Sequence, residues 1–244
     1  MAPYRPLKPT WARESCDLSM HEYHFATLLV TVFQSALLLN GSIVDSGAHF
    51  GGESCFFADL APERTVHAVE PLNSNIHRMG KYRDRKNIKP LLGALGSTAR
   101  MMELHTPRHS SMLSGVTSAP NATKDSRTAV PVYRLDDLFA TERLAFAHLD
   151  VEGSENDVLR GAEMVLRRDR PVFTVEVTTS STAYWETLRT LKALDYRAML
   201  VDEQCGVMSD CRNIICVPQE RSAELPKRVI EETNERTAKH VAKG

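Results

Sequence analysis

The chain has 244 residues, 42% of them hydrophobic and 25% charged, an ordinary composition for a globular protein of one or two domains. Its 30 Lys and Arg nearly balance 31 Asp and Glu, so the net charge of −1 gives no electrostatic support for a nucleic-acid binder. Five scattered cysteines form no Cys-x-x-Cys pair, which argues against a zinc site and a disulfide framework. We therefore expect free thiols and a cytoplasmic location, with a Cys205–Cys211 bridge as the alternative.

The chain starts with a polar, proline-containing arm over residues 1–19. An apolar helix is expected over residues 20–39, ending at Asn40-Gly41. Its apolar run, residues 25–39, has 15 residues, whereas a membrane-spanning helix needs about 20. We expect a buried helix and no membrane span. The helix should either cover the functional site or make a homodimer contact.

Apolar strands and amphipathic helices alternate from residue 42 onward. The pattern predicts strands at 42–45, 65–70, 88–92, 130–135, 144–149, 172–177, 197–201 and 214–217, and helices at 53–60, 73–82, 155–167 and 183–194. Such alternation is typical of a doubly wound, mostly parallel sheet, a Rossmann-like α/β fold. Asp136, directly after one strand, is expected to be the N-cap of a short helix.

The alternation divides the chain into three segments: an N-terminal arm and helix (1–41), a catalytic domain (42–217) and a charged C-terminal tail (218–244). Within the domain, residues 105–129 are rich in Ser, Thr, Pro and Gly and carry no periodicity. We expect this segment to be a loop over the substrate. His105 and His109 flank it and are candidate bases if the loop closes.

Four apolar strands have an acid at their end or one residue from it: Asp45, Glu70, Asp150 and Glu176. In doubly wound sheets, ligands bind outside the carboxyl ends of the strands. We therefore expect these four acids along one rim of the sheet, facing a ligand.

A glycine-rich loop, Gly47-Ala48-His49-Phe50-Gly51, leads from the first strand to a helix, so its backbone N–H groups can face a ligand at the helix N-terminus. Glu70 ends the next strand, where an acid suits the hydroxyls of a ribose. The G-x-G-x-x-G pattern of dinucleotide sites is absent, and Asp45 would repel a pyrophosphate. S-adenosylmethionine, which carries a positive charge and a ribose, fits better than NAD.

Six blocks of the sequence carry a resemblance to a known family. They are IVDSGAHFGGES (43–54), VHAVEP (66–71), ALG (94–96), YRLDDL (133–138), AHLDVEGSENDVLRGAEMVL (147–166) and RPVFTVEV (170–177). Their order resembles that of the FkbM-type S-adenosylmethionine-dependent methyltransferases. The resemblance implies a class I methyltransferase fold, with a seven-stranded sheet whose last strand is antiparallel, and O-methylation of a sugar or natural-product hydroxyl. The sequence departs from the family loop D-x-G-A-N-x-G at His49, which replaces Asn.

The resemblance also implies roles for single residues. The cofactor-binding residues would be Asp45, Gly47, Ala48, Gly51 and Ser54 around the methionine part, Glu70 and Pro71 at the ribose, and Ala94 near the adenine. Asp150 would face the transferring methyl group. Asp150, Glu152 and His49 are the candidate catalytic residues, because the acceptor hydroxyl must lose a proton. Asp150 and Glu176 would either hold a Mg²⁺ ion or interact through hydrogen bonds.

Three classes of function remain open from the sequence. The preferred one is an O-methyltransferase acting on a hydroxyl of a sugar, glycan or small natural product. The second is a module that binds S-adenosylmethionine or S-adenosylhomocysteine without turnover, which His49 keeps open. An NAD-dependent oxidoreductase is the third, disfavoured by Asp45 and the missing glycine.

Overall fold

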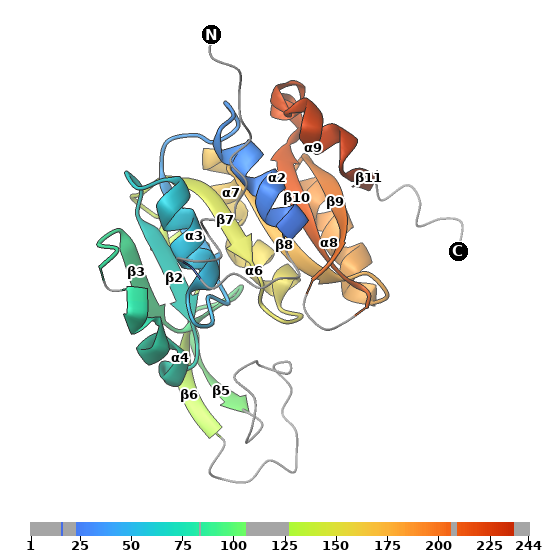
Figure 1. Ribbon diagram of the computed structural model, residues 1–244. Coiled ribbons are helices and arrows are strands. Elements are labelled where there is room, and N and C mark those ends of the chain that lie inside the picture. The colour runs from blue at the N-terminus through green and yellow to red at the C-terminus, as the bar shows by residue number, and fades with distance from the viewer. Residues whose placement is uncertain (1–15, 17–22, 83, 106–126, 206–208, 237–244) are drawn as a thin grey trace.

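The computed structural model describes residue 16 and residues 23–82, 84–105, 127–205 and 209–236 (Figure 1). Its main sheet has the strand order β11-β9-β10-β8-β7-β1-β2-β3. The strands are β1 (Ser42–Ser46), β2 (Val66–Glu70), β3 (Ile88–Leu92), β7 (Leu144–Leu149), β8 (Val172–Thr178), β9 (Tyr196–Gln204), β10 (Cys211–Pro218) and β11 (Asn234–Arg236). The helices are α2 (Tyr23–Phe33), α3 (Gly52–Leu60), α4 (Asn73–Arg78), α5 (Leu135–Leu138), α6 (Glu155–Gly161), α7 (Glu163–Asp169), α8 (Thr182–Ala193) and α9 (Lys227–Glu231), with 3₁₀ turns at Met79–Tyr82 and Gln219–Glu224.

The topology is the doubly wound one that the alternation predicts. Strand β1 pairs in parallel with β2 and β7, and β7 pairs in parallel with β8. Strand β10 lies between β8 and β9 and is antiparallel to both, as the class I methyltransferase fold requires of its last strand. The expected charged tail contributes β11, which pairs with β9 and extends the sheet to eight strands.

Helices cover both faces of the sheet. Helices α2 and α3 pack with Phe146, Val172 and Ile215 in one hydrophobic core, and α9 joins them there. On the opposite face, α6, α7 and α8 pack with Phe173, Val175 and other apolar strand residues in a second core, as Figure 1 shows. Since both faces are buried, the central strands are continuous apolar runs.

Helix α2 is shorter than the sequence predicts and is fixed at its first turn. It ends at Phe33, because the Ser35 hydroxyl donates to the Val32 carbonyl at 2.7 Å and accepts from Leu37 N, which favours a turn over further helix. At its start, the Glu203 carboxylate accepts hydrogen bonds from His24 N at 2.9 Å and Phe25 N at 2.6 Å. Glu203 therefore caps α2 from the end of β9.

The predicted helix over 155–167 is two helices, α6 and α7, divided at Ala162. Gly161 lies so close to the next segment that a Cβ atom would come within 2.0 Å of the Gly96 carbonyl oxygen. The prediction that Asp136 caps its own helix is wrong, since it lies inside α5. Its carboxylate instead accepts from Val165 N at 2.9 Å and so caps the first turn of α7.

A second, three-stranded sheet, β4-β6-β5, extends from the main body (Figure 1). Its strands are β4 (Ala94–Leu95), β5 (Arg100–His105) and β6 (Arg127–Tyr133). The expected loop over 105–129 is therefore too long at both ends, because its flanks pair as antiparallel strands. Its remaining part, residues 106–126 with His109, lies outside the described residues.

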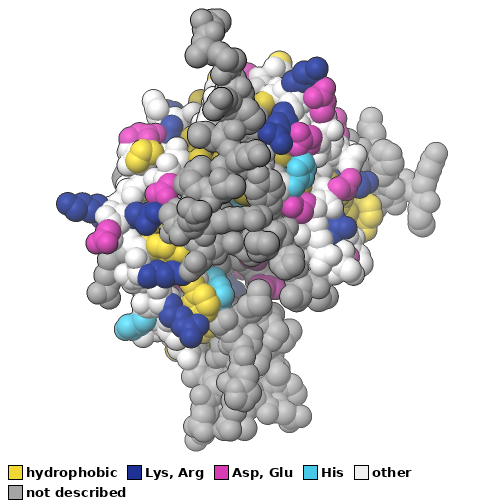
Figure 2. Space-filling model, viewed as in Figure 1, with side chains coloured by type: hydrophobic (Ala, Val, Ile, Leu, Met, Phe, Trp, Pro, Cys, Tyr) yellow, Lys and Arg dark blue, Asp and Glu magenta, His cyan; other side chains and the backbone are white. Residues whose placement is uncertain are grey.

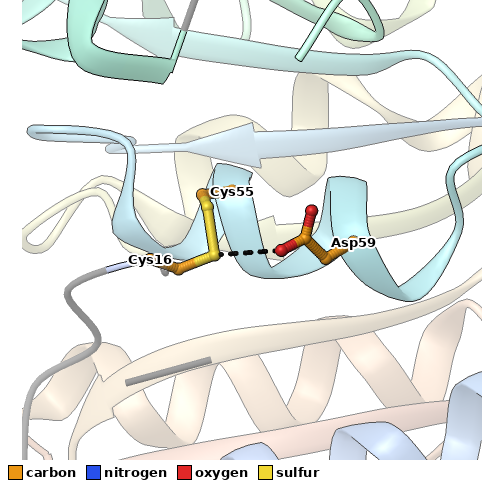
Figure 3. A group of neighbouring side chains, drawn as sticks. All are labelled: Cys16, Cys55 and Asp59. Atoms are coloured by element: carbon orange, nitrogen blue, oxygen red, sulfur yellow. Dashed lines mark hydrogen bonds between the residues drawn. A yellow bond between two sulfur atoms is a disulfide. The ribbon is translucent and has the colours of Figure 1, made fainter. Parts of the chain in front are cut away.

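Four of the five cysteines form disulfides, Cys16–Cys55 and Cys205–Cys211, and Cys216 is a buried free thiol. The expectation of free thiols is wrong for these four, whereas the alternative bridge Cys205–Cys211 is confirmed. Cys16 reaches Cys55 on α3 from a sequence separation of 39, which spacing alone does not reveal (Figure 3).

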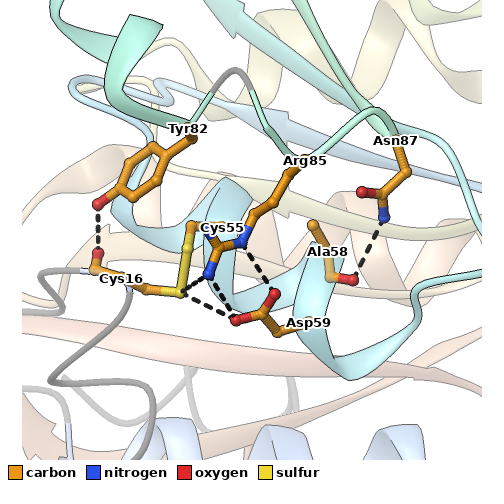
Figure 4. The surroundings of a disulfide bond; sticks show 7 residues. All are labelled: Cys16, Cys55, Ala58, Asp59, Tyr82, Arg85 and Asn87. Carbon is orange, nitrogen blue, oxygen red and sulfur yellow. Dashed lines mark hydrogen bonds and ion pairs between the residues drawn. A yellow bond between two sulfur atoms is a disulfide. The ribbon is translucent and has the colours of Figure 1, made fainter.

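The Cys16–Cys55 bridge belongs to the hydrophobic core, and polar side chains lie beside it (Figure 4). The Tyr82 hydroxyl donates to the Cys16 carbonyl at 2.7 Å, and Arg85 forms an ion pair with Asp59 at 2.9 Å. On the face shown in Figure 2, basic and acidic side chains are intermixed. In the described part of the chain, no helix is long and apolar enough to cross a membrane.

Candidate active site

The glycine loop between β1 and α3 is held tightly against the neighbouring strand ends. The backbone N–H groups of Gly47 and Ala48 both donate to the Val69 carbonyl, at 3.0 and 3.1 Å. Gly47 has a φ of +85°, and a Cβ atom there would lie 1.7 Å from the Asp150 carbonyl oxygen. Only glycine fits this position, and its missing side chain lets the backbone of the loop pack directly against Asp150 at the end of β7. Gly51, with φ +83°, then begins α3.

Asp45 lies beneath this loop with 1% of its surface exposed. One of its oxygens, Oδ2, accepts a hydrogen bond from the Ser54 hydroxyl. The other, Oδ1, is buried and has no hydrogen-bond partner among the described residues. Burial and the nearby Glu53 carboxylate raise the pKa of Asp45 to about 8. A buried carboxylate with an unused oxygen is costly by itself and is suited to a cationic ligand.

Glu70 is held by three hydrogen bonds. Its carboxylate accepts from His49 N at 2.9 Å, Leu72 N at 2.8 Å and Asn75 Nδ2 at 3.1 Å. A carboxylate has about four lone-pair positions, so about one remains for a ligand. Burial raises the pKa of Glu70, whereas these hydrogen bonds lower it. Glu70 can thus accept one ligand hydroxyl without losing an existing contact.

The remaining cofactor candidates follow the ends of β2 and β3. Pro71 is buried beside Glu70, and Ala94 is half-buried in β4. The preceding Gly93 N donates to the Glu70 carbonyl at 3.1 Å, which brings this segment next to the rim. Beyond it, the Ser97 hydroxyl and backbone N–H donate to the Asp157 carboxylate of α6, at 2.7 and 3.1 Å.

Acids from three elements gather at the ends of β7 and β8. Glu176 lies on β8 and is half-buried, Glu152 follows β7 with a φ of +50°, and Glu155 begins α6. The Glu155 carboxylate accepts from Gly153 N at 2.8 Å. Burial, and then the carboxylates of Glu152, Glu155 and Glu53, raise the pKa of Glu176 to about 7. This cluster stands beside Asp150, whose N–H donates to the Ser46 carbonyl at 2.9 Å.

His49 lies on the Glu70 side of the loop. Its ring stacks on Phe50 with centroids 3.6 Å apart, and the Arg78 guanidinium lies 4.6 Å from the Phe50 ring. Burial, and then Arg78, lower the pKa of His49. Its Nε2 is buried without a hydrogen-bond partner in the described part of the chain. As a neutral imidazole it is able to accept a proton, and its backbone N–H is bound to Glu70. Its catalytic role stays a prediction.

The geometry does not support a magnesium site at Asp150 and Glu176. Within the described residues, two groups of three potential ligands converge to within 4.8 Å, Cys16-Cys55-Asp59 and Glu176-Cys205-Cys211. Both contain a disulfide, whose sulfurs are no longer thiolate ligands. Asp150 belongs to neither group.

The sequence predictions missed two residues near the site, Glu53 and Asn213, and one helix cap, Glu203. The Glu53 carboxylate raises the pKa of both Asp45 and Glu176. Its position in the first turn of α3, after the glycine loop, was the feature of the sequence that could have indicated it. Asn213 interrupts the apolar strand β10 and pairs in register with Glu176. Glu203, the cap of α2, had no local signal, because its partners are 178 and 179 residues away.

The sequence around this site matches a known protein family. Residues 45–198 match the model of the methyltransferase FkbM domain, which begins at Asp45 and covers the glycine loop, Glu70, Asp150 and Glu176. The chain belongs to the FkbM methyltransferase family. The matched model is that of a methyltransferase domain. A comparison with curated proteins gives no match.

Two solved structures show the same fold. One is methyltransferase FkbM from Methylobacillus flagellatus, with a TM-score of 0.51 and 18% identity over 76% of this chain. This FkbM-family chain spans 47% of that protein's length. The other is fibrillarin from Aeropyrum pernix with natively bound S-adenosylmethionine, with a TM-score of 0.51 and 18% identity over 80% of this chain and 74% of that one. At this identity, both comparisons establish the class I methyltransferase fold alone.

Proposed function

We propose that this FkbM-family protein transfers a methyl group from S-adenosylmethionine to a hydroxyl of a sugar, glycan or small natural product. The observation that carries the proposal is that the tight loop at Gly47 lies above the buried carboxylate of Asp45. A loop that only glycine can form lies against Asp150, and beneath it a buried carboxylate oxygen has no partner among the described residues. This arrangement supports a ligand that is both cationic and closely approached by backbone.

The residues present fit this cofactor. Asp45, with Gly47, Ala48, Gly51 and Ser54, would hold the charged methionine part, since an ammonium group supplies the missing partner of Asp45 Oδ1. Glu70 and Pro71 would meet the ribose, and Ala94 the adenine. When bound, the cofactor supplies an electrophilic methyl group on a sulfonium.

The protein must then align the acceptor and remove its proton. Alignment of the reacting atoms contributes a large part of the rate enhancement in such a displacement. A positioned base adds typically about 10²–10⁴-fold. Asp150 follows the end of β7, directly beside the glycine loop, and Glu152 and Glu176 lie on the same rim. These carboxylates are our candidates for acceptor contact and proton removal.

The first experiment is calorimetric titration of S-adenosylmethionine, S-adenosylhomocysteine and NAD against the wild type and Glu70→Ala. We expect micromolar binding of the first two, weakened in the variant. Binding of NAD instead, or of none of the three, contradicts the proposal. Glu186→Gln, on the exposed side of α8, is the matched control for loss of a carboxylate.

A binding module without turnover remains the second candidate, because His49 replaces the Asn of the family loop. Product formation distinguishes the two. A protein that binds S-adenosylhomocysteine but transfers no tritiated methyl group to sugars or phenols would favour the module. His49→Asn should then restore transfer if this residue alone is responsible.

We also propose that the protein works in an oxidising compartment. The cytoplasmic location expected from the sequence is untested, but two disulfides support the alternative, because glutathione and thioredoxin keep cytosolic thiols reduced. Rapid alkylation of native extract, followed by mass spectrometry, should label Cys216 alone, and only after denaturation. Labelling of all five cysteines would place the protein in a reducing compartment.

A further inference from the structure

The face of the sheet beneath α2 and α3 carries a second polar feature, distinct from the cofactor loop. Asn213 on β10 has 2% of its surface exposed, and its Oδ1 has no hydrogen-bond partner among the described residues. An unpaired, buried amide oxygen lowers the stability of the fold. Asn213 stands in a strand whose neighbours Ile214, Ile215 and Cys216 are all fully buried. Packing alone therefore gives no reason for an asparagine here.

Asn213 and Glu176 lie side by side. They pair in antiparallel register between β10 and β8, so their side chains project from the same face of the sheet. Thr174, two residues before Glu176, pairs with His148 on the α2 side, which identifies that face. Beyond them, the Cys205 and Cys211 sulfurs lie within 4.8 Å of a Glu176 carboxylate oxygen. The disulfide thus forms a wall beside the two polar groups.

The region around Glu176 and Asn213 presents mainly hydrogen-bond acceptors. Asn213 presents an acceptor oxygen, and Glu176, Glu152, Glu155 and Glu53 present carboxylates from four separate segments. The charged groups that shift the pKa of Glu176 are all carboxylates. Arg212, the basic neighbour of Asn213, pairs with Val177 and so projects from the opposite face. Among the described residues, the charged groups that act on Glu176 are therefore all negative, and this region would repel an anion.

We propose that Glu176 and Asn213 form the acceptor subsite, and that it takes a polyhydroxylated acceptor that is uncharged or carries an amine, and rejects phosphorylated or carboxylated ones. This inference rests on the proposed methyltransferase function. Asn213 Oδ1 accepts a hydrogen bond from one acceptor hydroxyl or amine and fixes its orientation. Glu176 receives the proton of the reacting hydroxyl. The hydroxyl oxygen forms the new O–CH₃ bond while the methyl–sulfur bond breaks, and its electron pair remains on sulfur as S-adenosylhomocysteine.

The first test is stability, because it needs no acceptor. A residue kept for ligand binding is not required by the fold, so Glu176→Gln and Asn213→Leu should melt at or above the wild-type temperature. For Glu176 the sign follows from its pKa, which is raised from 4.5 to about 7 in the folded state. Its ionised form destabilises the fold, so the gain of Glu176→Gln should be larger at pH 8 than at pH 5. The neighbouring groups that titrate with it are Glu53, Glu152 and Glu155.

The second test is transfer of tritiated methyl from S-adenosylmethionine to four probes: methyl α-glucoside, glucosamine, glucose 6-phosphate and glucuronic acid. We expect transfer to the first or second, at least tenfold less to the last two, and a loss of at least tenfold in both variants. S-adenosylhomocysteine affinity should stay within about twofold of the wild type. Glu186→Gln, an exposed glutamate paired with Arg160, should change none of these values.

The outcomes distinguish failure of the subsite from failure of the proposed function. Loss of several degrees in the melting temperature of both variants, or transfer to glucose 6-phosphate equal to that of methyl α-glucoside, overturns the subsite. If no probe is methylated, the melting data decide alone. Failure of the wild type to bind S-adenosylhomocysteine contradicts the proposed function itself rather than this subsite.

Discussion

Removal of the Cys16–Cys55 disulfide should have a large and calculable effect on stability. The bridge closes a loop with a sequence separation of 39, which holds α2 and β1. In the chain-entropy treatment, releasing a loop of this length costs about 4 kcal/mol of folding free energy. The Cys205–Cys211 bridge closes a separation of only 6, for which the same treatment gives about 2 kcal/mol. The double variants Cys16→Ser/Cys55→Ser and Cys205→Ser/Cys211→Ser are therefore matched, and the first should lose about twice as much.

Urea unfolding followed by circular dichroism measures both losses, and the corresponding fall in melting temperature for the first variant is about 10 °C. Reductant should lower the wild-type stability and leave a variant without either bridge unchanged. Equal losses in the two double variants would refute the loop-entropy reasoning. A wild type that does not respond to reductant would show that the bridges are absent.

Three further perturbations test the site. Gly47→Ala should lower the free energy of unfolding by more than about 2 kcal/mol and abolish S-adenosylhomocysteine binding. Gly153→Ala, with φ +92° and open space around its Cβ position, should lower it by only about 1 kcal/mol. Equal losses of stability and of calorimetric affinity in the two variants would show that the contact with Asp150 is not responsible. The pKa of Asp45 is raised from 3.8 to about 8, so its ionised form destabilises the fold as pH rises from 4 through 8, and Asp45→Asn should be more stable than the wild type at pH 8. The same variant should bind S-adenosylmethionine at least tenfold more weakly. The affinity of the wild type for S-adenosylmethionine should rise between pH 6.5 and 8.5, and a flat pH profile would contradict this assignment. Glu203→Gln should cost about 1 kcal/mol through the first turn of α2, and unchanged hydrogen exchange at His24 and Phe25 would argue against the cap.

The fold could be predicted from the sequence because its signals are local. The predicted strands β1 to β3 and β6 to β10 are apolar runs bounded by polar residues, whereas β4 and β5 were missed. The order of acids at the strand ends follows from the parallel topology. Asp45, Glu70 and Asp150 therefore appear where the pattern predicts them. The boundaries that failed, at Phe33 and Ala162, depend on a serine side chain and on the close approach of Gly161 to Gly96. Neither contact leaves a mark in hydrophobic periodicity.

The rest of the site depends on contacts between distant segments. Cys16 and Cys55 are joined because α3 lies beside Cys16, and spacing does not reveal that pairing. Asp136 looks like a cap for its own helix, but the N–H group that it reaches belongs to Val165. Asn213 attracted no attention as a single polar residue in an apolar strand. Its register with Glu176 depends on β10 entering the sheet antiparallel to β8.

The cap on α2 has a consequence for how the protein is made. Helix α2 precedes every strand of the sheet, yet Glu203 is added 178 and 179 positions after the residues that it caps. At about 5–20 residues per second, the ribosome needs about 10–40 s to cover that span. Throughout that interval the core that holds Phe25, Leu28 and Leu29 lacks Met199 and Val201 of β9. Helix α2 is thus completed late in folding, and a nascent chain halted before β9 would leave part of the apolar side of α2 exposed to chaperones.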